Sequence, residues 1–213
     1  RLKFKDDLES IVTAAVENAR TAVREAGHGY VALDLGPTGR LLKPLGDLDF
    51  EDAVELYKEV VRIGRREGAD LLLIETMSDS YETKAALLAA KENCNLPVFV
   101  SNAYGEDGKL MTGASPSAMV ALAEGMGADA IGANCSLEPK QMHGVVKELL
   151  ENALGTDKDI LERVVQRMTH MELTGNIRRR DYDIEGLGGA ILARLKITVL
   201  LPKGVPFVLK RGR

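Results

Sequence analysis

Two residues that could carry chemistry follow apolar runs of the sequence. Cys135 lies in "GANCSLEP" (132–139), and Glu75 lies in "IETMSD" (74–79), at the end of "LLLI". A cysteine thiolate binds metal ions or attacks electrophiles, and a nearby helix N-terminus favours the thiolate form. A carboxylate beside a buried run is costly unless it meets a ligand or a partner. Both residues are therefore candidates for a functional site.

Each candidate also has a purely structural interpretation. A cysteine is often a small buried hydrophobic residue, and Glu75 could form a salt bridge inside the fold. The polar neighbours of Cys135, which are Asn134 and Ser136, favour a functional role for the sulfur. The other cysteine, Cys94, lies at the end of a predicted helix and is interpreted as structural. Two cysteines are too few for a disulfide framework.

The segments that must position these residues alternate between short apolar runs and amphipathic stretches. Apolar runs closed by glycine or proline predict strands, and apolar residues at helical spacing predict helices. The predicted strands cover residues 30–36, 69–76, 96–104 and 128–135. The predicted helices cover residues 6–27, 49–68, 79–94, 115–127 and 138–153. Strands that are apolar on both faces and alternate with helices indicate βαβ units and a parallel sheet.

In folds of this class, chemistry lies where the strands end and the loops begin. Four such places occur here, namely "DLGPTG" (34–39), "IETMSD" (74–79), "SNAYGEDGKLMTG" (101–113) and "GANCSLEP" (132–139). Cys135 and Glu75 are thus both predicted to lie on the catalytic side of the sheet.

Composition narrows the class of protein. The chain has 213 residues, 45% of them apolar, and a net charge of −4, which is typical of one soluble domain. It has no apolar run near the roughly 20 residues that a membrane helix needs, and its start lacks the apolar core of a signal peptide. Tryptophan is absent, which argues against a stacking surface for nucleic acid. We therefore expect a cytoplasmic protein with neither a membrane nor a nucleic acid as partner.

The net charge and the alternation of predicted strands and helices both change after residue 153. Residues 1–153 carry 16 basic and 25 acidic side chains, whereas residues 154–213 carry 12 and 7, so the net charge changes from −9 to +5. Such a change often marks a second module or a tail. The pattern predicts a boundary at 153 and a basic tail over 154–213. Within the tail, residues 196–202 and 205–210 are predicted short strands, and 174–194 shows no clear strand.

Four motifs together resemble a known family. They are "LDLGPTGRLLKPLGDLDFEDAVELYKE", "GADLLLIETMSDSYETKAALLAAKE", "GKLMTGASP" and "DAIGANCSLEPKQMHGVVKEL". In this order and spacing they resemble the homocysteine S-methyltransferase domain, in the form of the homocysteine-binding module of cobalamin-dependent methionine synthase. The resemblance runs from about residue 4 to residue 153.

The resemblance implies a fold, a reaction and a site. The family fold is a (β/α)8 TIM-type barrel, of which this chain would supply about four βα units, the family's strands three to six, followed by an unassigned C-terminal tail. The implied reaction transfers a methyl group to homocysteine, giving methionine. Three cysteine thiolates hold zinc, which activates the homocysteine sulfur, and methylcobalamin donates the methyl group. The implied partners are homocysteine and the cobalamin and folate modules of an intact methionine synthase.

The resemblance also assigns roles to residues. Cys135 matches the first zinc cysteine, and Glu75 matches the acidic residue that contacts the amino group of homocysteine. Asn134 and the loop over residues 36–39 line the same mouth. The other two zinc ligands of the family form an adjacent Cys-Cys pair in "GGCCG", and this chain has no such pair. We therefore expect this chain alone to be weakly active or inactive.

Two other hypotheses remain open at this point. The chain could be a non-catalytic α/β fragment that self-associates or binds a partner chain through open sheet edges. It could also be a metal-independent barrel enzyme that acts on a small carboxylate, with Glu75 as the general base.

Overall fold

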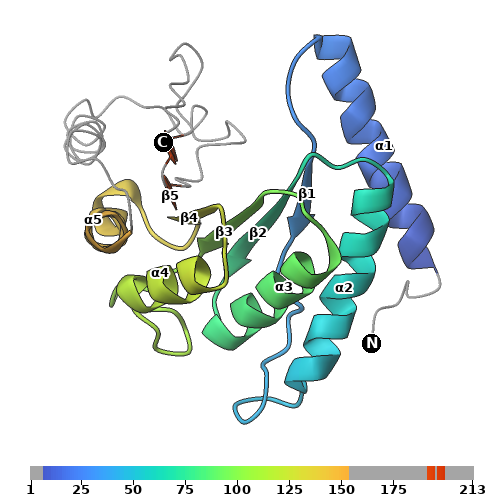
Figure 1. Cartoon of the computed structure of the whole chain (residues 1–213). Coiled ribbons are helices and arrows are strands. Elements are labelled where there is room, and N and C mark those ends of the chain that lie inside the picture. The colour runs from blue at the N-terminus through green and yellow to red at the C-terminus, as the bar shows by residue number, and fades with distance from the viewer. Residues whose placement is uncertain (1–6, 154–190, 195, 200–213) are drawn as a thin grey trace. The chain divides into compact units, whose positions relative to one another are not determined.

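The computed structural model describes residues 7–153, 191–194 and 196–199 (Figure 1). Helices and strands alternate through the first of these ranges, as the sequence predicts. The helices are α1 (Leu8–Ala26), α2 (Phe50–Arg66), α3 (Ser80–Asn93), α4 (Pro116–Gly125) and α5 (Pro139–Asn152). The strands are β1 (Ala32–Leu35), β2 (Leu71–Met77), β3 (Val98–Asn102) and β4 (Ala130–Ala133). Every element predicted between residues 6 and 153 is confirmed.

The helix ends follow from local chemistry. Gly27 ends α1 in the left-handed conformation, with φ +74°, and its N–H donates to Val23 O over 3.0 Å. Pro116 and Pro139 open α4 and α5, where a missing N–H costs no hydrogen bond. The hydroxyl of Ser115 accepts from Ala118 N over 3.2 Å and caps α4.

The first four strands form one parallel sheet in the order β1-β2-β3-β4 (Figure 1). Between β1 and β2, Asp34 lies opposite Leu73 and Leu35 lies opposite Ile74. Parallel neighbours in sequence order, each pair joined by a helix, are consecutive βα units, as in a TIM-type barrel. The predicted α/β class is therefore confirmed.

The chain divides into two compact units. Among the described residues, the first comprises residues 7–75 and 81–99, and the second comprises residues 76–80, 100–153, 191–194 and 196–199. In the first unit α1 lies beside α2, and in the second α4 lies beside α5, which also contacts β4. The core of the first unit includes Leu33, Leu35, Val61, Leu72, Ile74 and Leu87, and that of the second includes Tyr104, Met119, Ile131, Val146 and Leu149.

A short hairpin-like pair lies in the segment that was predicted to be a basic tail. Strand β5 (Ile191–Arg194) pairs antiparallel with β6 (Lys196–Val199), with Ile191 opposite Val199. β6 confirms the predicted strand that starts at residue 196. β5 lies where no strand was expected. So short a segment carries little residue pattern of its own, and its pairing with β6 makes it a strand. The strand predicted over 205–210 lies outside the described residues, and the boundary at 153 stays a prediction.

Within the described ranges, no helix combines the length and the apolar character that crossing a membrane requires.

Candidate functional site

In the second unit, Cys135 lies in a tight turn directly after β4. Cys135 and its neighbour Ser136 both have left-handed backbones, with φ +56° and +60°, which is uncommon for residues other than glycine. The N–H of Leu137 closes the turn by donating to Cys135 O over 2.7 Å. The Cys135 side chain is exposed. The interpretation of Cys135 as a small buried hydrophobic residue is therefore wrong.

The other cysteine behaves as the sequence predicts. Cys94 is buried just after α3, and its thiol donates to Ala90 O over 3.3 Å. That contact ties the sulfur to its own helix and makes Cys94 a structural residue.

Asn134 connects the Cys135 turn to two other strands. Its amide oxygen accepts from the backbone N–H of Thr76 over 3.2 Å and from the hydroxyl of Ser101. Its amide nitrogen donates to Thr76 Oγ1 over 2.7 Å and to Cys135 Sγ over 3.3 Å. Asn134 and Ser101 are 6% and 1% exposed, so the bond between them is buried, whereas the bonds of Asn134 to Thr76 and Cys135 are partly buried. Asn134 thus joins the ends of β2, β3 and β4 in the second unit.

Thr76 is strained, and Asn134 holds it. Its φ of +61° places a β-branched residue in the left-handed region, where its side chain crowds the backbone. Conformations of this kind cost about 1–3 kcal/mol each and persist only where the surroundings fix them. Here the two hydrogen bonds to the Asn134 amide do so. This strain has no signal in the sequence, because threonine is common in strands.

In the first unit, Glu75 is half-buried on β2 near a second carboxylate, Asp34 of β1. Burial raises the pKa of Glu75 above its usual 4.5, and the negative charge of Asp34 raises it further. Asp34 is more exposed, but partial loss of water still raises the pKa of its carboxyl, and the N–H of Leu35 offsets part of that rise. Glu75 has no ion-pair partner in the described part of the chain. The structure therefore offers no support there for the salt-bridge interpretation of Glu75.

Asp34 was not among the site residues predicted from the sequence. Its signal is the alternation in "ALDL", which sends Asp34 and Ala32 to one face of β1 while Leu33 and Leu35 are buried on the other. The register between β1 and β2 places Asp34 near Glu75. That register cannot be predicted from the sequence of one strand.

The loop over residues 36–39 is held by a buried carboxylate. Glu82 of α3, only 3% exposed, accepts from Thr38 N over 2.7 Å and from Thr38 Oγ1 over 2.6 Å. The Tyr57 hydroxyl of α2 lies 3.0 Å from the same oxygen and 3.1 Å from Gly36 O. Neither Glu82 nor Tyr57 was identified from the sequence, since both act through contacts with a distant loop. Together they fix the first of the four strand-end loops.

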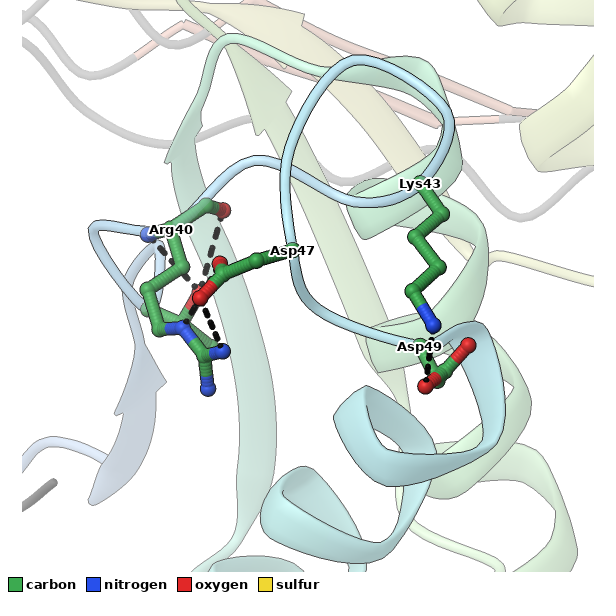
Figure 2. A network of polar contacts seen from close by, with 5 residues as sticks. Arg40, Lys43, Asp47 and Asp49 are labelled. Atoms are coloured by element: carbon green, nitrogen blue, oxygen red, sulfur yellow. Dashed lines mark hydrogen bonds and ion pairs between the residues drawn. The ribbon is translucent and has the colours of Figure 1, made fainter.

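The chain then continues through a second loop before α2 begins. Arg40 pairs with Asp47 over 2.8 Å, and Lys43 pairs with Asp49 over 2.9 Å, as Figure 2 shows. All four side chains are largely exposed, so solvent screens both pairs. Backbone contacts also close the loop: Lys43 N donates to Leu48 O over 2.9 Å.

The described residues do not assemble a metal centre. Among them, no group of three or more histidine, cysteine or acidic side chains lies close enough to hold a metal ion. The chain has two cysteines in all, and Cys94 is buried and bonded to its own helix. The three-thiolate zinc site implied by the resemblance does not fit this chain by itself.

Comparison with known proteins agrees with the family resemblance of the four sequence motifs. A family model described as homocysteine S-methyltransferase matches residues 1–183. Methionine synthase of Mycobacterium leprae is 31% identical over 129 residues, which are 58% of this chain and 11% of that protein. Methionine synthase of Mycobacterium tuberculosis is 30% identical over the same length. The chain thus spans about a tenth of the length of these relatives.

Solved structures with a similar fold include one enzyme in two states. The apo form of the homocysteine methyltransferase MmuM from Escherichia coli has a TM-score of 0.61 and 23% identity, covering 71% of this chain and 58% of that one. Its metallated form has a TM-score of 0.59, covering 68% and 55%. At this identity the likeness shows the fold alone, and it supports a partial TIM-type barrel.

Proposed function

Because the chain belongs to the homocysteine S-methyltransferase family, we propose that its site serves methyl transfer to the sulfur of homocysteine, giving methionine. The observation that carries this proposal is the family match over residues 1–183. Within that match, the exposed sulfur of Cys135 lies at the end of β4, where barrel enzymes place their chemistry.

We further propose that the reaction is of the methionine synthase type. The two mycobacterial relatives, which are methionine synthases, support this assignment. On this proposal the methyl donor is methylcobalamin, and the partners are the cobalamin and folate modules of a longer protein. The chain would work in the cytoplasm.

Glu75 is proposed to bind the ammonium group of homocysteine. Its carboxylate is half-buried and lies near a second negative charge at Asp34, so a cation at this place would relieve the repulsion between the two. Asn134 is proposed to line the site next to Cys135. These roles come from the family resemblance, and the charge around Glu75 supports the first of them.

Zinc is the group that the family implies, and the residues of this chain fit it only in part. Cys135 would supply one thiolate, and a zinc ion bound by one thiolate lacks the closed ligand set of known sites. No catalytic step is therefore assigned to zinc in this chain alone. We propose that the chain by itself transfers methyl groups weakly or not at all.

Two measurements on the purified chain test this proposal. Zinc bound after removal of the free ion should be well below one per chain, and Cys135→Ser should lower it further while Cys94→Ser should not. Isothermal titration with L-homocysteine should detect binding that Glu75→Gln weakens about tenfold or more. One tightly held zinc per chain would contradict the incomplete site, and a lack of homocysteine binding at millimolar concentration would contradict the proposed substrate.

One observation favours a second, non-catalytic function. β1 is an outer strand of the four-stranded sheet, with a strand neighbour on one side within the described residues. Outer strands of this kind pair with other chains unless they are covered. Light scattering after size-exclusion chromatography tests for self-association, and a monomer at every concentration would exclude it.

A further inference from the structure

We infer that Asn134 is a positioning residue, which fixes the sulfur of Cys135 and the end of β2 before any ligand arrives. The inference rests on the proposed role of Cys135 and deepens it, because it concerns what holds the sulfur in place. It is carried by the hydrogen bonds of one side chain inside the second unit.

The Asn134 amide is saturated with hydrogen bonds. An asparagine side chain can accept two hydrogen bonds at its oxygen and donate two from its nitrogen. The oxygen accepts from Thr76 N and Ser101 Oγ, and the nitrogen donates to Thr76 Oγ1 and Cys135 Sγ. All four positions are used by protein atoms. A substrate atom that bound this amide would have to displace one of them, whereas a positioning role displaces none.

These hydrogen bonds hold two residues in place. Thr76 and Cys135 both have left-handed backbones, and both receive a hydrogen bond from the same amide nitrogen. Residues other than glycine keep that conformation only where neighbouring groups fix it. Asn134 itself is 6% exposed, and its backbone N–H donates to Asn102 O over 3.1 Å, which anchors it to β3. The amide is therefore a fixed point from which the exposed sulfur is oriented.

Ser101 does not hold the sulfur. Ser101 also contacts Asn134, but its hydroxyl reaches the amide oxygen rather than the nitrogen that faces Cys135. Replacing Ser101 by alanine therefore leaves both the contact with the sulfur and those with Thr76 in place. Ser101→Ala is a matched control for substitutions at Asn134.

The test measures the reactivity of Cys135 with iodoacetamide, an uncharged reagent, using neither metal nor homocysteine. Rate constants for Cys135 and Cys94 are read from the same samples by peptide mass spectrometry. Asn134→Asp places a carboxylate beside the sulfur and opposes the charge of the attacking thiolate. We expect it to slow Cys135 about tenfold, Asn134→Ala to slow it about threefold, and Ser101→Ala to change it less than twofold.

Cys94 distinguishes positioning from a general loss of structure. It is buried, so it reacts faster only when the fold opens. Slowing of Cys135 with an unchanged Cys94 rate supports the inference. Unchanged Cys135 rates in both Asn134 variants, with an unchanged Cys94 rate, would overturn it.

A measurement on the unaltered chain keeps the inference testable if the Asn134 variants do not fold. Both side-chain amide hydrogens of Asn134 should exchange with D₂O at least tenfold more slowly than those of exposed Asn18, and should shift in NMR spectra when Cys135 is alkylated. Exchange as fast as at Asn18 would overturn the inference. Failure of homocysteine binding would leave these results unaffected, so the two proposals fail separately.

Discussion

Glu82 and Thr38 lie 44 residues apart in sequence and are joined by two hydrogen bonds to a single carboxylate oxygen. The bonds are short, at 2.7 Å from the Thr38 N–H and 2.6 Å from its hydroxyl, and Glu82 is 3% exposed. A buried carboxylate that accepts several hydrogen bonds fixes its donors more strongly than a neutral group would. The loop after β1 is thus held from α3.

Removing this carboxylate should be costly. Glu82→Ala removes the acceptor of two hydrogen bonds from Thr38 and of one from the Tyr57 hydroxyl. We therefore expect a loss of roughly 3 kcal/mol in the free energy of unfolding. Glu82→Gln keeps one acceptor oxygen and should cost roughly 1 kcal/mol. Urea denaturation of the three proteins measures both. Equal stability of Glu82→Ala and the unaltered chain would show that the loop is held by other contacts.

The carboxyl groups at the ends of β1 and β2 should make stability depend on pH. The pKa of Glu75 is raised by burial and by the charge of Asp34, and the pKa of Asp34 is raised by burial. A raised pKa in the folded state means that the folded chain binds the proton more tightly than the unfolded chain. The stability that these two groups contribute is therefore fully present at a pH below their usual pKa values, 3.8 for Asp34 and 4.5 for Glu75. It is lost as the pH rises above those values.

Glu75→Gln tests this dependence, because glutamine does not titrate. We expect the variant to be more stable than the unaltered chain at pH 7, with a flatter dependence of unfolding free energy on pH from 4.5 upward. Denaturation at a series of pH values measures the difference. A steeper loss of stability in the variant would mean that the ionised Glu75 carboxylate has a favourable partner.

Replacing either of two helical glycines by alanine should change the free energy of unfolding, in opposite directions at the two positions. At Gly64 of α2, an added Cβ would lie 2.4 Å from Cδ2 of the buried Leu33 of β1, so Gly64→Ala should lose roughly 1–3 kcal/mol of unfolding free energy through overpacking. At Gly144 of α5, an added Cβ meets nothing within 4 Å, and Gly144→Ala should gain up to about 1 kcal/mol from helix propensity. Thermal denaturation compares the two. A stabilised Gly64→Ala would show that α2 can move away from the sheet.

The sequence predicts the elements of the first 153 residues well because local signals agree with the fold. Gly27 ends α1 as a glycine in the left-handed conformation does, and Pro116 and Pro139 open their helices. Apolar periodicity then fixes which face of each element is buried. β5 was not predicted, because four residues carry too little apolar pattern and their pairing with β6 determines that they form a strand.

The candidate site is only partly predictable for a different reason. The exposure of Cys135 follows from its polar neighbours and its place after a strand. The contacts of Asn134 with Thr76 and of Glu82 with Thr38 depend on register and on helix placement, which no single segment encodes. Strain at Thr76 is likewise a tertiary effect, since threonine would otherwise adopt an extended backbone.

The loop in Figure 2 allows a last prediction, about what holds it closed. The ion pair between Arg40 and Asp47 is exposed, and its attraction is weakened by water and by the entropy of ordering two side chains. Backbone packing is tighter, because a Cβ added at Gly46 would lie 2.1 Å from Leu41 O.

Asp47→Asn should therefore leave the thermal midpoint unchanged within error, and added salt should change the unaltered chain equally little. Gly46→Ala should lose roughly 1–3 kcal/mol of unfolding free energy, because backbone atoms must move to admit the methyl group. Parallel thermal and urea denaturation of both variants decides between the two causes. If Asp47→Asn were the more damaging change, the charged pair rather than the backbone would close this loop.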